Sequence, residues 1–191
     1  MRLEEIQEQL RARRRRGRAL HRSLGSNAGA GLRVALGADH GGVALKAQLH
    51  HTLVELGVEV EDLGTGDTKP VDYPDIAAAV ARRVASGDCR FGIVIDAAGL
   101  GSCMAANKIP GIRAATCHDE ATARNSREHN DANVLVLGAR VLHPGQARRL
   151  LRLWLRTPFA AGRHALRVAK LAGLDAARQE KPPLARGGGV P

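Results

Sequence analysis

The segment Phe91-Gly-Ile-Val-Ile-Asp-Ala-Ala-Gly-Leu-Gly-Ser-Cys103 carries the strongest indication of the fold. Its first five residues are apolar throughout, which is typical of a strand in a sheet covered by helices on both faces. Asp96 follows directly, and Gly99 and Gly101 then allow the backbone to turn sharply into a helix expected over 102–108. The segment therefore predicts a strand, a turn and a helix, the repeating unit of an α/β protein.

The same alternation continues along the chain. It predicts a Rossmann-like α/β fold of three layers, in which a five-stranded parallel sheet carries helices on both faces. Ligands bind to such sheets beyond the carboxyl ends of the strands. The remaining strands are expected at 33–37, 58–62, 112–116 and 133–137, and the remaining helices at 42–56, 74–86, 119–129, 144–156 and 160–173.

Two segments flank the domain, which is expected to span residues 32–175. Residues 1–31 form a basic N-terminal extension, in which an amphipathic helix over 2–24 is followed by a Gly-rich linker over 25–31. The extension holds eight Arg against three Glu, so it supplies +5 of the formal net charge of +10. Residues 176–191, rich in Pro and Gly toward the end, are expected to form a disordered tail.

Composition argues against several classes of function. Aromatic residues make up only 2% of the chain, too few for a surface that stacks nucleic-acid bases, so no specific nucleic-acid binding is expected. No apolar run reaches the ~20 residues of a membrane span, and no signal peptide is recognisable. Three cysteines without a CxxC pair indicate a reducing cytoplasm. The spacing of His and Cys suits no metal site, so neither a metal nor a cofactor is expected.

Two loops that follow strands contain residues capable of chemistry. Asp39 and His40 come after the first strand, where an acid beside an imidazole can move protons or bind an anion. The alternative is a helix cap, in which Asp39 accepts backbone N–H bonds. After the third strand, the backbone around Gly99 and Gly101 can form an anion cradle at a helix N-terminus, or simply a tight turn.

Further candidates lie on predicted helices. His129 and Asn130, at the end of the helix before the fifth strand, can act on a substrate oxygen, or His129 can simply meet free carbonyls there. Arg163 and Arg167 are four residues apart and share one helical face. Such a pair forms a phosphate clamp or a solvated surface.

Taken together, eight short motifs resemble the ribose-5-phosphate isomerase B family, which also includes galactose-6-phosphate isomerase subunits. The resemblance covers about residues 32–173 and implies a metal-independent interconversion of an aldose phosphate and a ketose phosphate, such as ribose 5-phosphate and ribulose 5-phosphate of the pentose phosphate pathway. It also implies a homodimer, or a dimer of dimers, with active sites at the subunit interface. The motifs are Gly37-Ala-Asp-His-Gly-Gly42, Asp72-Tyr-Pro-Asp75, Gly99-Leu-Gly101, Ala105-Ala-Asn-Lys108, Gly111-Ile-Arg113, Arg127-Glu-His-Asn-Asp131, Gly138-Ala-Arg140 and Gly162-Arg-His164.

Residue roles follow from the resemblance by position. His129 is implied to open the sugar ring with the help of Asp39, and the backbone N–H groups of 97–101 to stabilise an enediolate oxygen, as an oxyanion hole does. The other implied roles are Tyr73 and Asn130 at sugar hydroxyls, His40, Arg140, Arg163 and Arg167 at the phosphate, Gly99, Leu100 and Gly101 within the N–H loop, and Asn107 as a support of that loop.

The chain departs from the family pattern at the base that moves the proton between C1 and C2. Many members carry a cysteine where this chain has Asp96, and another branch has a glutamate at the position of Ser102; Ala98 replaces the usual hydroxyl residue. A carboxylate can act as this base, so the first hypothesis is an isomerase that uses Asp96. The second is a sugar-phosphate-binding or scaffold protein without turnover.

The N-terminal extension raises a separate question. An amphipathic helix on a Gly-rich linker resembles the targeting peptides that load enzymes into bacterial microcompartments. The Arg block also suits weak binding to nucleic acid or to an anionic membrane, and a solvated basic extension is the simplest alternative. We therefore expect a cytoplasmic protein, with a microcompartment shell as one partner that residues 1–31 can reach.

Overall fold

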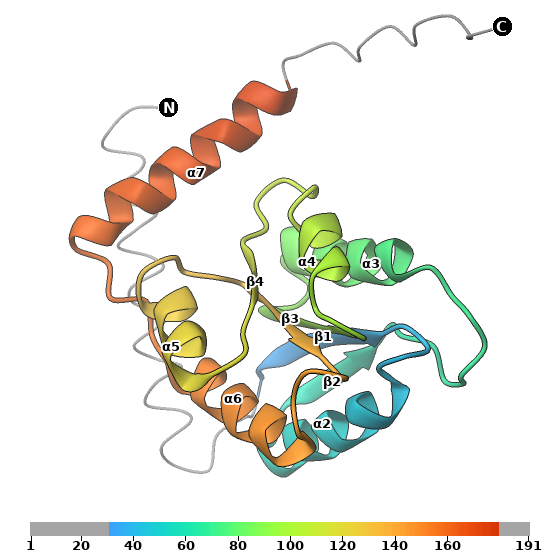
Figure 1. Cartoon of the computed structure of the whole chain (residues 1–191). Helices are drawn as coiled ribbons and strands as arrows, with labels where there is room; N and C mark the ends of the chain where they lie inside the picture. The colour runs from blue at the N-terminus through green and yellow to red at the C-terminus, as the bar shows by residue number, and fades with distance from the viewer. Residues whose placement is uncertain (1–30, 180–191) are drawn as a thin grey trace, which may run out of the picture.

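Strand β3 (Phe91–Asp96) is buried along its whole length and lies at the centre of a five-stranded sheet (Figure 1). The computed structural model describes residues 31–179. Within them the paired strands all run parallel, in the order β2-β1-β3-β5-β4. The five-stranded parallel sheet predicted from the sequence is therefore confirmed. The other strands are β1 (Arg33–Ala38), β2 (Glu59–Asp62), β4 (Ala114–Thr116) and β5 (Val134–Gly138).

Helices cover both faces of this sheet, which confirms the three-layer α/β fold. One face packs against α2, α5 and α6, and the other against α3 and α4 (Figure 1). Each of these helices begins and ends within two residues of its predicted range. Their bounds are α2 (Val43–Glu55), α3 (Tyr73–Ala85), α4 (Gly101–Ala106), α5 (Glu120–Glu128) and α6 (Pro144–Arg156).

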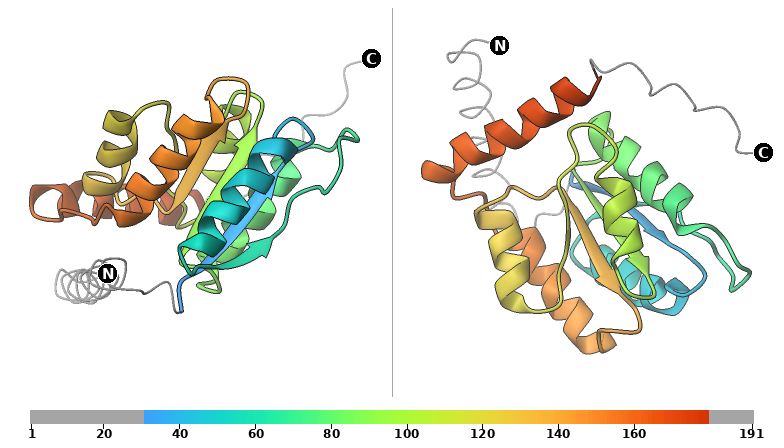
Figure 2. Two further views of the ribbon diagram at one scale, coloured as in Figure 1. Left: turned by 90° about the horizontal axis from the view of Figure 1, so that it is seen from below. Right: turned by 45° about the horizontal axis from the view of Figure 1, so that its top comes forward.

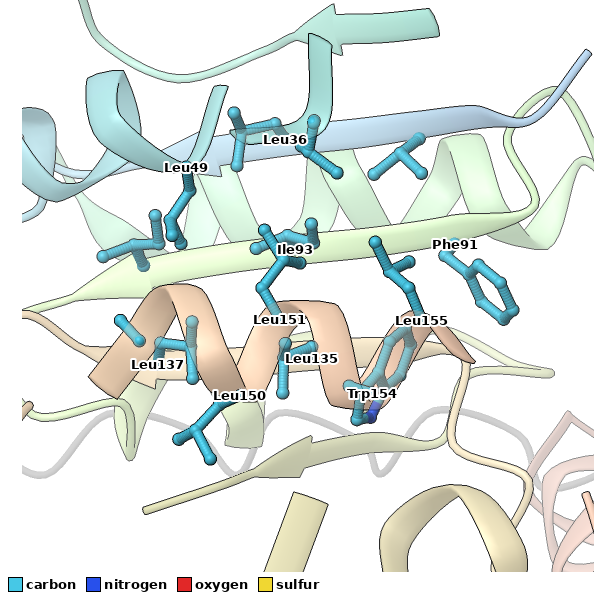
Figure 3. Close-up of a cluster of buried hydrophobic side chains, with 14 of the residues drawn as sticks. Leu36, Leu49, Phe91, Ile93, Leu135, Leu137, Leu150, Leu151, Trp154 and Leu155 are labelled. Carbon is cyan, nitrogen blue, oxygen red and sulfur yellow. The ribbon is translucent and has the colours of Figure 1, made fainter. Parts of the chain in front are cut away.

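Alternate residues of β3 face the two helical layers. Phe91 and Ile93 belong to the apolar cluster formed with α2 and α6, where the fully buried Trp154 meets Phe91 edge-on at 5.0 Å between ring centres (Figure 3). Gly92 faces the layer of α3 and α4, and a Cβ at this position would lie 2.7 Å from a methyl of Val80. The small side chains of α3 are therefore matched to a close approach of that helix to the sheet.

Helix α7 (Arg163–Gln179) differs from the others in position and length. It begins near α5 and runs along the β4 edge of the sheet, where the N–H of Gly111 donates to the carboxylate of Asp175 at 2.8 Å (Figures 1 and 2). The helix is longer than the predicted range of 160–173 and continues past residue 175, the expected end of the domain. Leu166 and Leu174 are each 67% exposed, so α7 presents apolar surface that residues 31–179 do not cover.

Some sequence-based expectations concern residues outside the described part of the chain. The helix over 2–24, nearly all of the linker, and the tail from residue 180 onward belong to this group. Between residues 31 and 179, no helix is long and apolar enough to cross a lipid bilayer. In the same part of the chain, no three His, Cys, Asp or Glu side chains form a group that could hold a metal ion.

A buried arginine lies at the end of the sheet where the strands begin. Arg127 of α5 is 3% exposed, and its guanidinium carbon lies 4.8 Å from the ring centre of Phe91 and 5.1 Å from that of Trp154. Its Nη1 donates to the carboxylate of Asp131 at 3.1 Å and to the carbonyl of Ala132. Burial lowers the pKa of Arg127 to about 10, so the side chain remains charged at neutral pH. Because Phe91 begins β3, the last turn of α5 lies at the amino ends of the strands.

Candidate functional site

The carboxylate of Asp96 organises the loop between β3 and α4. Asp96 ends β3 and is 5% exposed. Its Oδ1 accepts from the backbone N–H groups of Ala98, at 2.9 Å, and Gly99, and its Oδ2 accepts from that of Ser102 at 3.0 Å. Three backbone donors thus converge on one carboxylate, in the manner of a helix cap. The predicted anion cradle is therefore partly occupied by the chain's own carboxylate.

Neighbouring strands hold this loop in place. Gly99 has a φ of +79°, a conformation that favours glycine, and a Cβ there would lie 2.9 Å from a methyl of Thr116. The hydroxyl of Thr116, on β4, donates to the carbonyl of Gly99 at 2.6 Å. The backbone N–H of Arg140, after β5, donates to the carbonyl of Ala97 at 2.9 Å. The exposed Arg140 side chain is thereby brought to the rim of the loop.

The loop after β1 lies directly beside the Asp96 loop. The backbone N–H of Asp39 donates to the carbonyl of Ile95 at 3.2 Å. The Oδ1 atom of Asp39 accepts from Gly41 at 2.9 Å and Gly42 at 3.2 Å; this is the capping arrangement considered as an alternative from the sequence. His40 is exposed, and its Nδ1 accepts from the N–H of Val71 at 3.3 Å. Two carboxylates and one imidazole are therefore gathered at the carboxyl ends of β1 and β3.

Tyr73 and Asn107 contact α4 at different points. Tyr73 begins α3, and a Cβ on Gly101 would lie 2.6 Å from its ring. The phenol ring thus rests on the start of α4, at the edge of the Asp96 loop. The Asn107 side chain donates to the carbonyls of Cys103 and Ala114, both at 3.0 Å, and accepts from the N–H of Ala114 at 2.9 Å. Asn107 therefore fixes α4 to β4 and supports the loop only through this helix.

A second group of predicted site residues surrounds the end of α5. His129 follows this helix, and its ring stacks on that of His164, with ring centres 4.0 Å apart and planes inclined by 8°. Asn125 Nδ2 lies 2.9 Å from Nδ1 of His129, and Oδ1 of Asn125 accepts from the amide of Asn130 at 3.3 Å. His164 lies between Arg163 and Arg167 in the sequence of α7, and both arginines are exposed. The histidine pair and the arginine pair thus belong to one cluster.

These two groups lie at opposite ends of the sheet. The Asp96 loop is at the carboxyl ends of the strands, whereas His129 comes two residues after Arg127, which contacts Phe91 at the amino end of β3. Phe91 and Asp96 are five positions apart in β3, or about 16 Å of extended strand. One chain therefore does not bring Asp96 and His129 together, although the resemblance places both at one substrate.

Three residues with clear structural roles at these sites were not among the sequence-based candidates. Thr116 fastens the Asp96 loop, Asn125 contacts the ring of His129, and His164 stacks on that ring. Asn125 precedes His129 by four residues on α5, a spacing that places two side chains on the same face of a helix. His164 belongs to the motif Gly162-Arg-His164, which supports the resemblance but predicts no role for this histidine.

Known proteins with similar sequences identify the family of this chain. Residues 34–171 match the family described as Ribose/Galactose Isomerase. Ribose-5-phosphate isomerase B of Escherichia coli is 42% identical over 146 residues, which are 76% of this chain and 98% of that protein. D-erythrulose-4-phosphate isomerase of Pectobacterium atrosepticum is 38% identical over 152 residues, covering 78% and 98% respectively.

A solved structure extends the agreement to the fold. The structure of Clostridium thermocellum ribose-5-phosphate isomerase B superposes with a TM-score of 0.76 at 47% identity, covering 77% of this chain and 99% of that one. The residues that match the family include both groups of site residues and about half of α7. The chain therefore belongs to the ribose/galactose isomerase family.

Proposed function

We propose that this protein interconverts ribose 5-phosphate and ribulose 5-phosphate, or a related pair of sugar phosphates, without a metal ion. The observation that carries the proposal is the convergence of Asp96, Asp39 and the backbone donors of the β3–α4 loop at the carboxyl ends of β1 and β3. Ligands bind at this edge of open α/β sheets. The names of the relatives add the substrate class, a phosphorylated sugar that is an aldose or a ketose.

The reaction requires one base and one site for negative charge. A base removes the proton from C2 of the open-chain aldose, the electron pair forms the C1–C2 double bond, and the carbonyl oxygen at C1 becomes an enediolate oxygen. The ketose forms when the base returns its proton to C1 and the proton of O2 passes to O1, so that the carbonyl moves from C1 to C2 and no proton is gained or lost overall. In this proposal Asp96 is the base, and backbone N–H groups of residues 97–101, two of which donate to Asp96 in the free chain, bind the enediolate oxygen.

Asp96 has to exchange partners for this role. In the chain without substrate, its oxygens accept from Ala98, Gly99 and Ser102. The enediolate oxygen needs some of the same donors, so substrate and carboxylate compete for them. We infer that the substrate oxygen displaces the Asp96 carboxylate, which frees an oxygen to remove the C2 proton.

A second subunit supplies what one chain lacks. His129, Asn130, Arg163 and Arg167 lie at the end of the sheet opposite to Asp96, and α7 exposes Leu166 and Leu174. We propose a homodimer in which the His129 cluster of each subunit faces the Asp96 loop of its partner. The exposed leucines of α7 are suited to the interface, since such side chains gain free energy by leaving water.

One assay tests the proposed reaction. The full chain is incubated with ribose 5-phosphate, ribulose 5-phosphate is detected by its absorbance, and Asp96→Asn is run in parallel with Asp67→Asn as an exposed-carboxylate control. Turnover by the natural chain and the control, with loss in Asp96→Asn, supports the proposal. Full turnover in Asp96→Asn refutes the role of Asp96, and no turnover of ribose 5-phosphate or erythrulose 4-phosphate refutes the isomerase.

The occupied cradle favours one alternative function. A carboxylate that already accepts three backbone N–H bonds is suited to holding the loop in shape. In this alternative the chain binds sugar phosphates, or serves as a scaffold, without turnover. Calorimetric titration with ribose 5-phosphate separates the cases, because this alternative requires binding by both the natural chain and Asp96→Asn and product formation by neither.

The N-terminal extension, residues 1–31, is a separate proposal. We infer from its amphipathic pattern and Gly-rich linker that it carries the cytoplasmic enzyme into a microcompartment. The test fuses residues 1–31 to a fluorescent protein in a host that assembles shells. Fluorescent foci that depend on the shell support cargo loading, whereas diffuse fluorescence refutes it.

A further inference from the structure

The rings of His129 and His164 stack on each other at the end of α5. The two ring centres are 4.0 Å apart, and the 8° angle between the planes makes the contact face to face. His164 is 8% exposed, whereas His129 is only partly buried. The His129 ring is thus more accessible to a substrate than the His164 ring, which is buried and packs against one face of His129.

The charged groups that α7 places near the His129–His164 pair are cations. Arg163 and Arg167 of α7 flank His164, and no carboxylate among residues 31–179 forms an ion pair with either histidine of the stack. On α5, the Glu128 carboxylate is 3.8 Å from Arg124, its neighbour one turn earlier. Burial, followed by the charges of His129, Arg163 and Arg167, lowers the pKa of His164. The environment therefore opposes a positive charge on this ring.

Asn125 fixes the orientation of the His129 ring through a contact with Nδ1. Its Nδ2 lies 2.9 Å from Nδ1 of His129. When this amide donates, the neutral imidazole carries its proton on Nε2. Asn125 and His164 together then leave His129 with a defined plane and with Nε2 as the atom that exchanges a proton with the sugar.

We propose that His164 is a positioning residue for His129: its buried ring stacks face to face on the more exposed ring and holds it in the plane in which Nε2 meets the sugar. Two imidazolium rings at 4.0 Å would repel each other, since a nearby like charge disfavours protonation. A neutral His164, by contrast, presents its π face to a protonated His129, which is a favourable arrangement for a cation. The second proton of that ring lies on Nδ1, so the Asn125 amide then turns its oxygen toward this nitrogen. The proposal rests on the proposed function, because it assigns His164 to the ring-opening step of that reaction.

The experiment follows the imidazole nitrogens of the full chain by ¹⁵N NMR from pH 8 to pH 5. Assignments come from His164→Phe and His129→Phe. We expect two separate transitions, with His164 becoming protonated at lower pH than His129. If both rings titrate together, or if His164 takes the proton first, the proposal is wrong. This arm needs no turnover, so it decides the proton order even if the chain proves not to be an isomerase.

Kinetics of three variants test the consequence for catalysis. His164→Phe keeps a flat, neutral ring and should retain at least half of kcat, whereas His164→Ala should lower kcat at least tenfold with little change in KM. His164→Arg places a permanent cation beside His129, which disfavours its protonation, and should move the alkaline limb of the kcat/KM profile to lower pH. A wild-type kcat and pH profile in both His164→Ala and His164→Arg would overturn the proposal. If the natural chain also shows no turnover, the proposed function is refuted instead.

Discussion

The Oδ2 atom of Asp96 lies 3.0 Å from the backbone nitrogen of Ser102, at the first turn of α4. The last residue of the central strand is thereby joined to the helix that follows it, across the loop where the substrate oxygen is expected. The same carboxylate cannot hold this turn and remove a proton with the same oxygen. In the proposed reaction, holding the turn and removing the proton are therefore separated in time, and this separation is open to measurement.

Replacement of Asp96 should change the loop as well as the chemistry. Asp96→Asn keeps the size of the side chain but leaves one oxygen to accept, so at least one of the three N–H bonds is lost. We expect kcat to fall by roughly 10²–10⁴, the usual contribution of a general base. Amide hydrogen exchange at Ala98, Gly99 and Ser102 should become faster. Asp67→Asn, in an exposed loop, serves as the control, and unchanged exchange in Asp96→Asn would contradict the structural role.

Gly101 should tolerate no side chain without cost to substrate binding. In Gly101→Ala the new Cβ would lie 2.6 Å from the Tyr73 ring, which must move away from the loop. Because Tyr73 is 41% exposed, the ring has room to move, and we expect a loss of only about 1 kcal/mol in the free energy of unfolding. KM should rise about tenfold. Gly66→Ala is the matched control, since nothing lies within 4 Å of a Cβ there; equal KM values in both variants would contradict this reading.

Removal of the buried guanidinium should destabilise the fold strongly. Arg127→Ala deletes a cation packed between Phe91 and Trp154 and leaves Asp131 with Arg113, 3.1 Å away. Loss of one partner of a buried ion pair costs about 3–5 kcal/mol, and we expect the lower end because Arg113 remains. Urea unfolding measures the change. Arg124→Ala, on the exposed face of the same helix, should stay within about 0.5 kcal/mol; an equal effect of both variants would show that burial is not the cause.

Acid should weaken the start of α5. Asp119 caps this helix, with Oδ1 accepting from the N–H of Thr122 at 2.7 Å, and this backbone bond lowers the pKa of the Asp119 carboxyl. A lowered pKa means that the unfolded chain binds the proton more readily, so this contribution is present above about pH 4 and is lost as the pH falls further. Urea midpoints of the natural chain and Asp119→Asn should therefore converge between pH 5 and pH 2. A difference that stays constant over this range would refute the assignment.

Sequence patterns were sufficient for the fold because they are local and repeated. The apolar run of Phe91 to Ile95, and the helical spacing of apolar residues in α2 and α6, depend only on neighbours in the chain. The capping role of Asp39 could be considered in advance, since two glycines follow it. The partners of Asp96 could not, because the direction of its carboxylate depends on the turn that β4 and β5 impose on the loop.

Contacts between distant residues explain what else the sequence did not predict. His129 and His164 are 35 positions apart, and their stacking requires the particular path from α6 into α7. The separation of His129 from Asp96 likewise follows from the direction of α5, which runs against the strands. Individual residues were recognisable from their motifs, but their grouping into two clusters needed the three-dimensional arrangement.

Because Asp96 and His129 lie at opposite ends of the sheet, two different defective subunits should complement each other in the proposed dimer. A subunit defective only in Asp96 still carries an intact His129 cluster, and a subunit defective only in His129 still carries an intact Asp96 loop. When Asp96→Asn and His129→Asn chains are unfolded, mixed in equal amounts and refolded, half of the proposed two-fold dimers should be mixed, and each of these should contain one complete site. Two inactive preparations should together recover about a quarter of the natural activity, the statistical yield of complementation in a dimer with shared sites.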